Sequence, residues 1–336
     1  MRDILESLAR RQDLSPEQVS QAMNTIMDGE ATPAQIGGFL MGLRVKGETV
    51  EEIAAAAAVM RERAVPVEVH QDHLIDTCGT GGDGRSTFNV STACAFVAAV
   101  AGARVAKHGN RSVSSSSGSA DVLEAAGVRL DLAPDQVAEC IRRFGVGFLF
   151  APAHHGATRH AVGPRKELGV RTLFNLLGPM TNPASAPNQV MGVYSDRWVR
   201  PVAEVLGRLG SRHVMVVHSE DGMDEISTEA PTHVAELKDG EVEEWTLNPA
   251  DYDVEASGLD QVVAYTAQGS LDLIKEALTS SKGPAADLVA LNAGAAIFVA
   301  GITTNLIGGI ALAREIQGAG SAWATLRELA AYTQSL

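Results

Sequence analysis

Apolar residues recur at helical spacing over the first 65 residues of the chain. Three segments in this region begin with a hydroxyl residue that is followed three positions later by Glu or Gln, at Ser15, Thr32 and Thr49. This arrangement is the capping box of a helix N-terminus, and two of the three segments add proline at the first helical position. The pattern predicts a small all-helical unit that carries no obvious chemistry.

The pattern changes after residues 64–73, which alternate in polarity, contain a proline and are predicted to be a linker. Short apolar runs typical of buried strands then alternate with loops and helical segments. The predicted strands are residues 73–78, 104–108, 146–150, 189–194 and 213–218, and residues 233–247 form a predicted hairpin centred on Asp239-Gly240.

Strands that alternate with helices favour an α/β fold with a mainly parallel sheet. We therefore predict a small N-terminal all-helical domain over residues 1–70, with a possible contribution from about 157–185. A larger α/β domain over residues 71–336 is expected to contain a central mixed, mainly parallel sheet.

Composition and charge narrow the possible functions. The chain has 336 residues, and its net charge of -14 provides no basic field for nucleic acid or an anionic membrane. The most apolar run, residues 288–301, is shorter than the roughly 20 residues that span a bilayer. Cys78, Cys94 and Cys140 form no C-x-x-C pair, which suits a reducing compartment. We expect a cytoplasmic protein that binds neither nucleic acid nor membranes.

The segment DTCGTGGDG, residues 76–84, contains a G-x-G-x-x-G pattern at Gly79, Gly81 and Gly84. A dinucleotide site would also need an acidic residue at the end of the second strand, where this chain has Lys107. NAD binding is therefore disfavoured. Consecutive glycines can instead direct several backbone N–H groups into one concavity, which is a phosphate-binding arrangement.

Further donors follow the same two predicted strands. Residues 86–92 add hydroxyls at a predicted helix N-terminus, and residues 112–117 contain five serines. Lys107 and Arg111 flank the second of these loops, and Gly118-Ser119 leads into another helix. Because the carboxyl ends of parallel strands share one sheet edge, these segments fit a single polyphosphate ligand.

The motifs in these segments resemble those of the anthranilate phosphoribosyltransferases, and the resemblance extends from the N-terminal helices almost to the C-terminus. The motifs are GTGGDG (79–84), NVST (89–92), KHGNRSVSSSSGSADVLEAAG (107–127), PRKELGVRTLFNLLGPMTNP (164–183) and DGMDE (221–225). Pyrimidine nucleoside phosphorylases share the fold, but their loop after the second strand is of a K-x-S-G-R type, whereas this chain has KHGNR.

The resemblance implies a Mg²⁺-dependent pentosyltransferase of tryptophan biosynthesis, in which the amine of anthranilate displaces pyrophosphate from phosphoribosyl pyrophosphate. An aromatic amine is largely neutral at pH 7, so positioning and electrostatics should suffice without a general acid or base. The family also implies a homodimer formed through the helical domain.

Residue by residue, the resemblance implies three sets of contacts. For phosphoribosyl pyrophosphate they are Gly79, Gly82, Asp83, Thr87, Asn89, Val90, Ser91, Thr92, Lys107, His108, Gly109, Asn110, Arg111, Ser112, Val113, Ser114, Ser115 and Ser119. For anthranilate they are Gly79, His108, Asn110, His155 and Arg165. For magnesium they are Ser91, Asp224 and Glu225.

The chain departs from the family pattern at two positions. Ser116 stands where the family commonly has lysine, and Gly156 follows the two histidines where the family has proline or serine. Two alternatives remain at this point: a pyrimidine nucleoside phosphorylase of the same fold, and a non-catalytic relative that binds nucleic acid. The net charge of -14 argues against the second.

Overall fold

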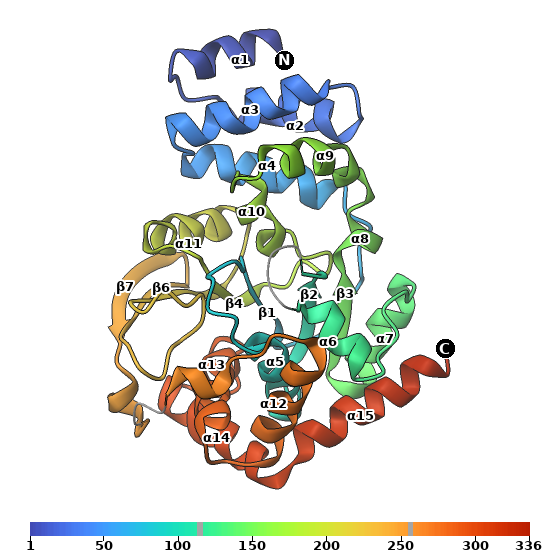
Figure 1. Cartoon of the computed structure of the whole chain (residues 1–336), viewed down its shortest axis with the longest axis vertical. Coiled ribbons are helices and arrows are strands. Elements are labelled where there is room, and N and C mark those ends of the chain that lie inside the picture. Colours follow the sequence, from blue (N-terminus) through green and yellow to red (C-terminus); the bar gives the residue numbers. More distant parts are fainter. Residues whose placement is uncertain (113–116, 255–257) are drawn as a thin grey trace.

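The computed structural model describes residues 1–112, 117–254 and 258–336 of the chain. Its N-terminal part is a bundle of α1 (Arg2–Ala9), α2 (Pro16–Met27), α3 (Pro33–Lys46) and α4 (Val50–Glu62), which lies at one end of the molecule (Figure 1). The predicted capping boxes form at Ser15, Thr32 and Thr49, so the sequence located the starts of three helices correctly.

A buried carboxylate joins three parts of this bundle. Glu52 in α4 is fully buried, and its Oε1 accepts a hydrogen bond from the backbone N–H of Leu14 at 2.8 Å. Its Oε2 pairs with Lys46 Nζ at 2.9 Å and accepts from the backbone N–H of Thr49 at 2.9 Å. The α1–α2 connection, the end of α3 and the start of α4 are thus held by one side chain.

The α/β part is built on a seven-stranded sheet in the order β3-β2-β1-β4-β5-β6-β7. The strands are β1 (Leu74–Gly79), β2 (Arg104–Gly109), β3 (Val146–Phe150), β4 (Asn188–Gly192), β5 (His213–Ser219), β6 (Thr232–Lys238) and β7 (Glu241–Leu247). Strands β1 to β5 are parallel, and β6 and β7 are antiparallel. The mixed, mainly parallel sheet and the hairpin are confirmed, with strand ends within two residues of those predicted.

Helices cover both faces of this sheet (Figure 1). The helices that follow the bundle in the chain are α5 (Val90–Val100), α6 (Ser119–Ala125), α7 (Pro134–Phe144), α8 (Ala151–His154), α9 (Arg159–Leu168), α10 (Phe174–Leu177), α11 (Val199–Arg208), α12 (Ala267–Thr279), α13 (Pro284–Val299), α14 (Leu306–Ala319) and α15 (Ser321–Gln334), with short 3₁₀ turns between some of them. Helices α5 and α13 pack on one face of the sheet, and α11 packs on the other against β5, β6 and α4.

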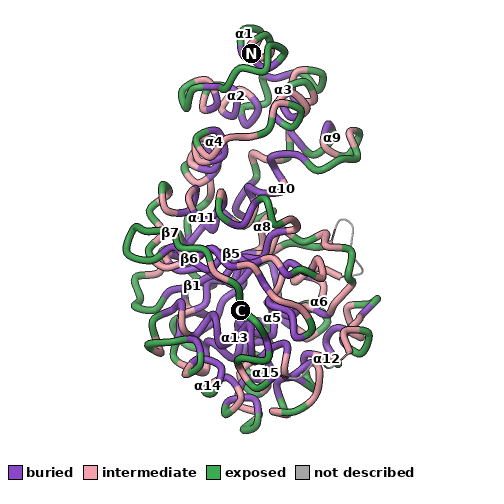
Figure 2. The backbone as a smooth tube through the Cα atoms, turned by 90° about the vertical axis from the view of Figure 1, so that its left-hand side faces the viewer, coloured by how far each residue is buried: buried purple, intermediate pink, exposed green. Residues whose placement is uncertain are grey.

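The buried apolar residues form two cores. The first lies between the sheet and the helices α5, α7 and α12 to α15. The second begins in the N-terminal bundle, continues through α10 and α11, and reaches residues of β4, β5 and β6. Figure 2 shows this buried interior passing from the bundle into the sheet. Among the described residues, no helix combines the length and apolar character needed to cross a membrane.

Two further contacts attach the bundle to the rest of the chain. Helix α9 packs against α2 and α3, although it lies far from both in the sequence. Arg61 of α4 is partly buried, and its guanidinium donates to the carbonyl of Met180 at 2.7 Å and to that of Leu209 at 3.0 Å. The N-terminal bundle is therefore held to the rest of the protein by residues that lie far from it in the sequence.

Candidate active site

The candidate active site lies at the point in the sheet where the strand order reverses, between β1 and β4. From β1 the chain proceeds outward to β2 and β3, then returns to place β4 on the other side of β1. Gly79 and Gly192 are partners in register at the carboxyl ends of these two strands. Ligands of open α/β sheets bind in the crevice outside such a switch point, and the predicted glycine loop begins there.

The loop after β1 depends on its glycines. Gly81, Gly82 and Gly84 have φ angles of 67°, 78° and 78°, which favour glycine. The backbone N–H of Gly81 donates to Asp224 Oδ2 at 2.7 Å. A Cβ on Gly79 would lie 2.8 Å from the same oxygen, and one on Gly192 would collide with the Asp224 carbonyl. The two paired glycines therefore leave room for the acidic segment beside the loop.

Three carboxyl groups meet at this place. Asp224 is buried, and its pKa is raised to about 7 by burial and by the charge of the neighbouring Asp83. Burial and the charge of Asp224 also raise the pKa of Glu225, and the nearby backbone of Ser91 opposes this rise. Asp83 Oδ2 is buried without a hydrogen-bond partner among the described residues. Carboxyls held so close are stabilised by a shared proton or a cation.

These groups suit Mg²⁺, which binds hard oxygen ligands and keeps several waters or substrate oxygens in its shell. Among the described residues, no three acidic, imidazole or thiol groups are arranged to hold a metal ion alone. A cation here would need the Ser91 hydroxyl, water or substrate oxygens as well. Ser91 and Glu225, two of the expected metal ligands, line one small cavity. Asp83, which the resemblance assigned to the substrate, lies near the third, Asp224.

Lys107 lies deeper than the sequence suggested. Its side chain is buried, and Nζ donates to the carbonyl of Thr77 at 2.5 Å and to the hydroxyl of Ser91 at 3.3 Å. Its charge offsets part of the rise in the pKa of Glu225. Lys107 therefore balances the acidic groups from beneath the site in this structure.

The sequence analysis did not identify one further buried acid, Asp76, which lies near this site. Asp76 of β1 is fully buried, accepts from the backbone N–H of His108 at 3.1 Å and from Asn182 Nδ2 at 2.8 Å. Burial raises its pKa to about 6, although Lys107 opposes the rise. Asn182 also donates to the carbonyl of Ala106 at 2.7 Å, so the pair ties β1 and β2 together below the site. An acidic residue inside an apolar strand was the available signal.

Two histidines expected to line the anthranilate site lie side by side. The rings of His108 and His155 are 5.1 Å apart, and their side chains are buried. Their Nε2 atoms have no hydrogen-bond partner among the described residues. Burial lowers the pKa of His108 to about 3 and that of His155 to about 4. Both rings are therefore neutral at physiological pH, and each can offer a lone pair or an N–H to a ligand.

Arg165 lies on the side of the molecule that carries the N-terminal bundle. It lies on α9, which packs against the N-terminal bundle (Figure 1), and its guanidinium lies 5.1 Å from the centre of the Phe174 ring. Burial lowers its pKa, but an arginine remains charged. Its pairing with a carboxylate stays a prediction, as does the role of Asn110 after β2.

The remaining predicted residues lie around the two loops. Asn89, Val90, Ser91 and Thr92 form the start of α5, and Thr87 pairs with Val263 in an isolated bridge. Asn89 contacts Ser117 across the site, with Nδ2 donating to the Ser117 carbonyl at 3.4 Å, and Ser270 of α12, which sequence reasoning missed, supports it at 2.8 Å. Val113, Ser114, Ser115 and Ser116 lie outside the described residues.

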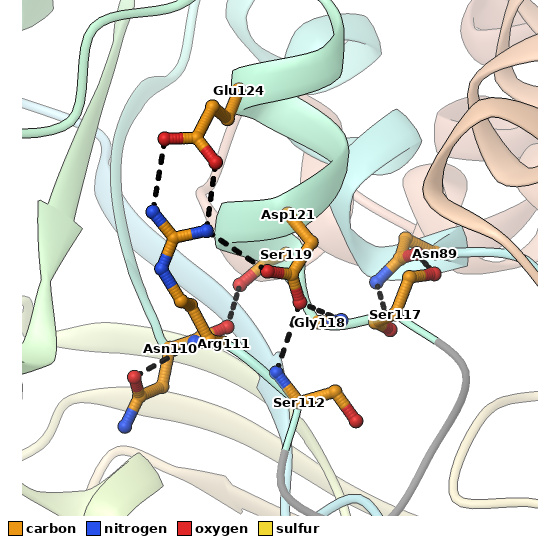
Figure 3. A network of polar contacts seen from close by, with 9 residues as sticks. All are labelled: Asn89, Asn110, Arg111, Ser112, Ser117, Gly118, Ser119, Asp121 and Glu124. Atoms are coloured by element: carbon orange, nitrogen blue, oxygen red, sulfur yellow. Dashed lines mark hydrogen bonds and ion pairs between the residues drawn. The ribbon is translucent and has the colours of Figure 1, made fainter.

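The loop after β2 is held by an ion-pair network (Figure 3). Arg111 Nη1 lies 3.1 Å from Asp121 Oδ1 and 2.7 Å from Glu124 Oε2, and Nη2 lies 2.9 Å from Glu124 Oε1. Gly109 ends β2 against Ser119 at the start of α6, where a Cβ would collide with the Ser119 hydroxyl. Arg111, expected at the phosphates, is thus paired with acids here.

Comparisons with known proteins agree with this architecture. Residues 71–323 match the family described as "Glycosyl transferase family, a/b domain", and residues 2–64 match its helical bundle domain. The anthranilate phosphoribosyltransferase of Thioalkalivibrio sulfidiphilus is 60% identical over 335 residues, which cover 100% of this chain and 99% of that protein.

Solved structures give the same result. The anthranilate phosphoribosyltransferase of Thermus thermophilus has a TM-score of 0.93 and 43% identity, covering 99% of each chain. The Saccharomyces cerevisiae enzyme in complex with phosphoribosyl pyrophosphate and Mg has a TM-score of 0.89 and 27% identity, covering 99% and 98%. A second structure of the yeast enzyme, with 4-fluoroanthranilate, has a TM-score of 0.88 and 25% identity over the same shares.

The full-length identity, the two matching domains and the glycine loop facing a buried acidic segment lead to one assignment. The chain belongs to the anthranilate phosphoribosyltransferase family.

Proposed function

We propose that this protein transfers the phosphoribosyl group of phosphoribosyl pyrophosphate to the amine of anthranilate, giving N-(5-phosphoribosyl)anthranilate and pyrophosphate in the second step of tryptophan biosynthesis. The observation that carries the proposal is the contact of the glycine loop with the buried acid Asp224, through Gly81. Backbone N–H groups suit phosphate, and adjacent carboxyls suit a cation that bridges phosphate oxygens.

The residues named above would bind different parts of the two substrates. Backbone groups of residues 79–84 and the hydroxyls at the start of α5 would hold the phosphates, in keeping with the yeast complex that contains this substrate. Arg165 would take the carboxylate of anthranilate bidentately. His108 and His155 would orient the amine, since both rings are neutral and lie together.

Asp224, Glu225 and Ser91, with Asp83 beside them, would hold Mg²⁺. Bound there, the metal supplies positive charge that stabilises the pyrophosphate as it leaves. The chain's part is to fix the acids in place through Gly79, Gly81 and Gly192 and to offset their mutual repulsion with Lys107. The amine attacks C1 of the ribose, the C1–O bond breaks, and the pyrophosphate departs with the electron pair. The nitrogen, positively charged after attack, then releases one proton to water or to the departing pyrophosphate.

We also propose an oligomeric state, a cellular location and a domain boundary for this protein. The active protein is a homodimer formed through the N-terminal bundle, which carries an exposed Val45 on α3. Free buried cysteines at positions 78, 94 and 140 support a cytoplasmic location, and the acidic net charge supports the absence of a nucleic-acid partner. The functional domain boundary lies near residue 70, with residues 157–185 acting alongside the helical domain.

The proposal is tested by the loss of anthranilate fluorescence in the presence of phosphoribosyl pyrophosphate and Mg²⁺. Wild-type protein should show the loss only when both are present. Asp224→Asn combined with Glu225→Gln should abolish most activity and move the Mg²⁺ requirement to higher concentration, because the cation loses two charged ligands. Thermal melting confirms folding. A magnesium curve unchanged by the double substitution would refute the metal assignment, and phosphorolysis of thymidine would refute the reaction.

A further inference from the structure

Asp121 in the first turn of α6 contacts three points of the loop after β2 (Figure 3). Its Oδ2 accepts hydrogen bonds from the backbone N–H of Ser112 at 3.0 Å and of Gly118 at 2.8 Å. Its Oδ1 pairs with Arg111 Nη1 at 3.1 Å. One carboxylate therefore joins Ser112 and Gly118, which are six positions apart in the chain, and also pairs with the neighbouring cation of Arg111.

The two ends of this loop are in close contact. A Cβ on Gly118 would lie 2.5 Å from the carbonyl oxygen of Asn110 and 2.5 Å from the backbone nitrogen of Ser112. The backbone N–H of Ala120 donates to the same Asn110 carbonyl at 3.3 Å. There is no space for a side chain at position 118, so Asp121 reaches the backbone of both ends directly.

The charge state of Asp121 supports this role. Burial alone would raise the pKa of its carboxyl, but the hydrogen bonds from Ser112, Gly118 and Arg111 lower it. The group is therefore an anion at neutral pH and an acceptor for charge-assisted hydrogen bonds, which are stronger than neutral ones.

Glu124, one turn further along α6, provides a contrast. It pairs with both terminal nitrogens of Arg111, at 2.7 and 2.9 Å, and its side chain is 56% exposed. Its hydrogen bonds reach Arg111 and no backbone group of the loop, among the residues that the structure describes. Exposed ion pairs of this kind contribute little. The two acids share a cation, but only Asp121 also holds the loop ends.

We propose that Asp121 is a positioning residue for phosphoribosyl pyrophosphate: it sets the backbone of Asn110, Arg111 and Ser112 where the substrate is bound, through its hydrogen bonds to Ser112 and Gly118. The inference rests on the proposed function. It assigns to Asp121 no contact with the substrate. It also predicts that the acid acts on substrate affinity separately from its pairing with Arg111.

A simpler role would be helix capping alone. The bond from the Gly118 N–H to Asp121 is a cap of α6, and Gln136 makes the equivalent bond in α7, where its Oε1 accepts from the backbone N–H of Ala133 at 2.9 Å. Gln136 is therefore a matched control. Its loss removes one cap bond from a helix that carries no predicted site residue.

The experiment measures the affinity of phosphoribosyl pyrophosphate by calorimetry with Mg²⁺, and the KM of each substrate, for Asp121→Asn, Asp121→Ala, Glu124→Gln and Gln136→Ala. We expect Asp121→Ala to weaken phosphoribosyl pyrophosphate about tenfold or more, with the KM of anthranilate nearly unchanged. Asp121→Asn, which keeps one acceptor oxygen, should fall between it and the wild type. Glu124→Gln and Gln136→Ala should change the affinity less than about twofold.

The outcomes separate the possibilities. Asp121 variants that are folded and bind with wild-type affinity would overturn the inference. Equal weakening by Glu124→Gln would show that pairing with Arg111 is the whole effect and would also overturn it. A fall in thermal stability matched by Gln136→Ala, with no change in affinity, would reduce Asp121 to a cap. If the wild type itself fails to bind phosphoribosyl pyrophosphate, the proposed function fails first, and the inference falls with it.

Discussion

At the scale of single residues, the buried histidines make stability depend on pH. His155 has a pKa of about 4 in the folded protein, below its usual 6.5, so the unfolded chain takes up the proton first as the pH falls. Its contribution to folding is complete above about pH 6.5 and is lost between there and about pH 4. At pH 5 the loss from this one group is about 2 kcal/mol.

We predict that His155→Gln reduces the acid sensitivity of the fold. The free energy of unfolding, measured in urea at pH 7 and pH 5, should fall by about 2 kcal/mol less for the variant than for the wild type. Asp76, with a pKa raised to about 6, affects both proteins equally and cancels in the difference. An identical decrease in the two proteins would mean that His155 is not held neutral.

Arg165 gives a second prediction at this scale. Arg165→Ala should raise the KM of anthranilate by about one to two orders of magnitude, because a charged hydrogen-bonding partner contributes about 1.5–3 kcal/mol. The KM of phosphoribosyl pyrophosphate should be nearly unchanged. Lys166→Ala is the control, since it removes a neighbouring cation from the same helix. Steady-state kinetics that show both substrates weakened alike would contradict the assignment of Arg165 to anthranilate.

At the scale of elements, Glu52 links three pieces of the helical bundle. Glu52→Gln should destabilise the protein by about 2 kcal/mol, because Lys46, only 4% exposed, loses its buried partner and keeps only the exposed carboxylate of Asp13. Glu51→Gln is the matched control: that neighbour pairs with Arg208 at the surface, with both side chains about half exposed, and should cost under about 1 kcal/mol. Urea unfolding of both variants checks the prediction. Equal effects would mean that the burial of Glu52 carries no energetic weight.

The elements themselves were largely predictable from the sequence. Capping boxes located three helices, and apolar runs located five parallel strands, because these signals are local. The bonds that complete the site are not local. Asp76 meets Asn182 across 106 positions, and Asp224 meets Gly81 across 143. The same reason explains Lys107: its place at the end of a strand suggested a phosphate contact, whereas its burial against Thr77 depends on how β1 and β2 pair.

At the scale of the whole molecule, the expected dimer can be tested on its exposed apolar residues. Val45 on α3 is 61% exposed in the single chain, and Ile307 on α14 is 66% exposed. If the N-terminal bundle forms the interface, Val45→Glu should shift the molar mass in light scattering toward that of a monomer, since a buried charge opposes association. Ile307→Glu, in the other domain, should leave the dimer intact. The reverse pattern would place the interface elsewhere.

The second hydrophobic core bears on how the molecule unfolds. It contains residues of the bundle together with residues of β4, β5 and β6, so neither part can expose its apolar face without the other doing so. The two matched domains should therefore melt as one cooperative unit in calorimetry, with a single heat-absorption peak, rather than in two steps. It follows that the proposed anthranilate side of the site, carried on α9, and the proposed phosphate side, at the edge of the sheet, should be lost together in one unfolding transition.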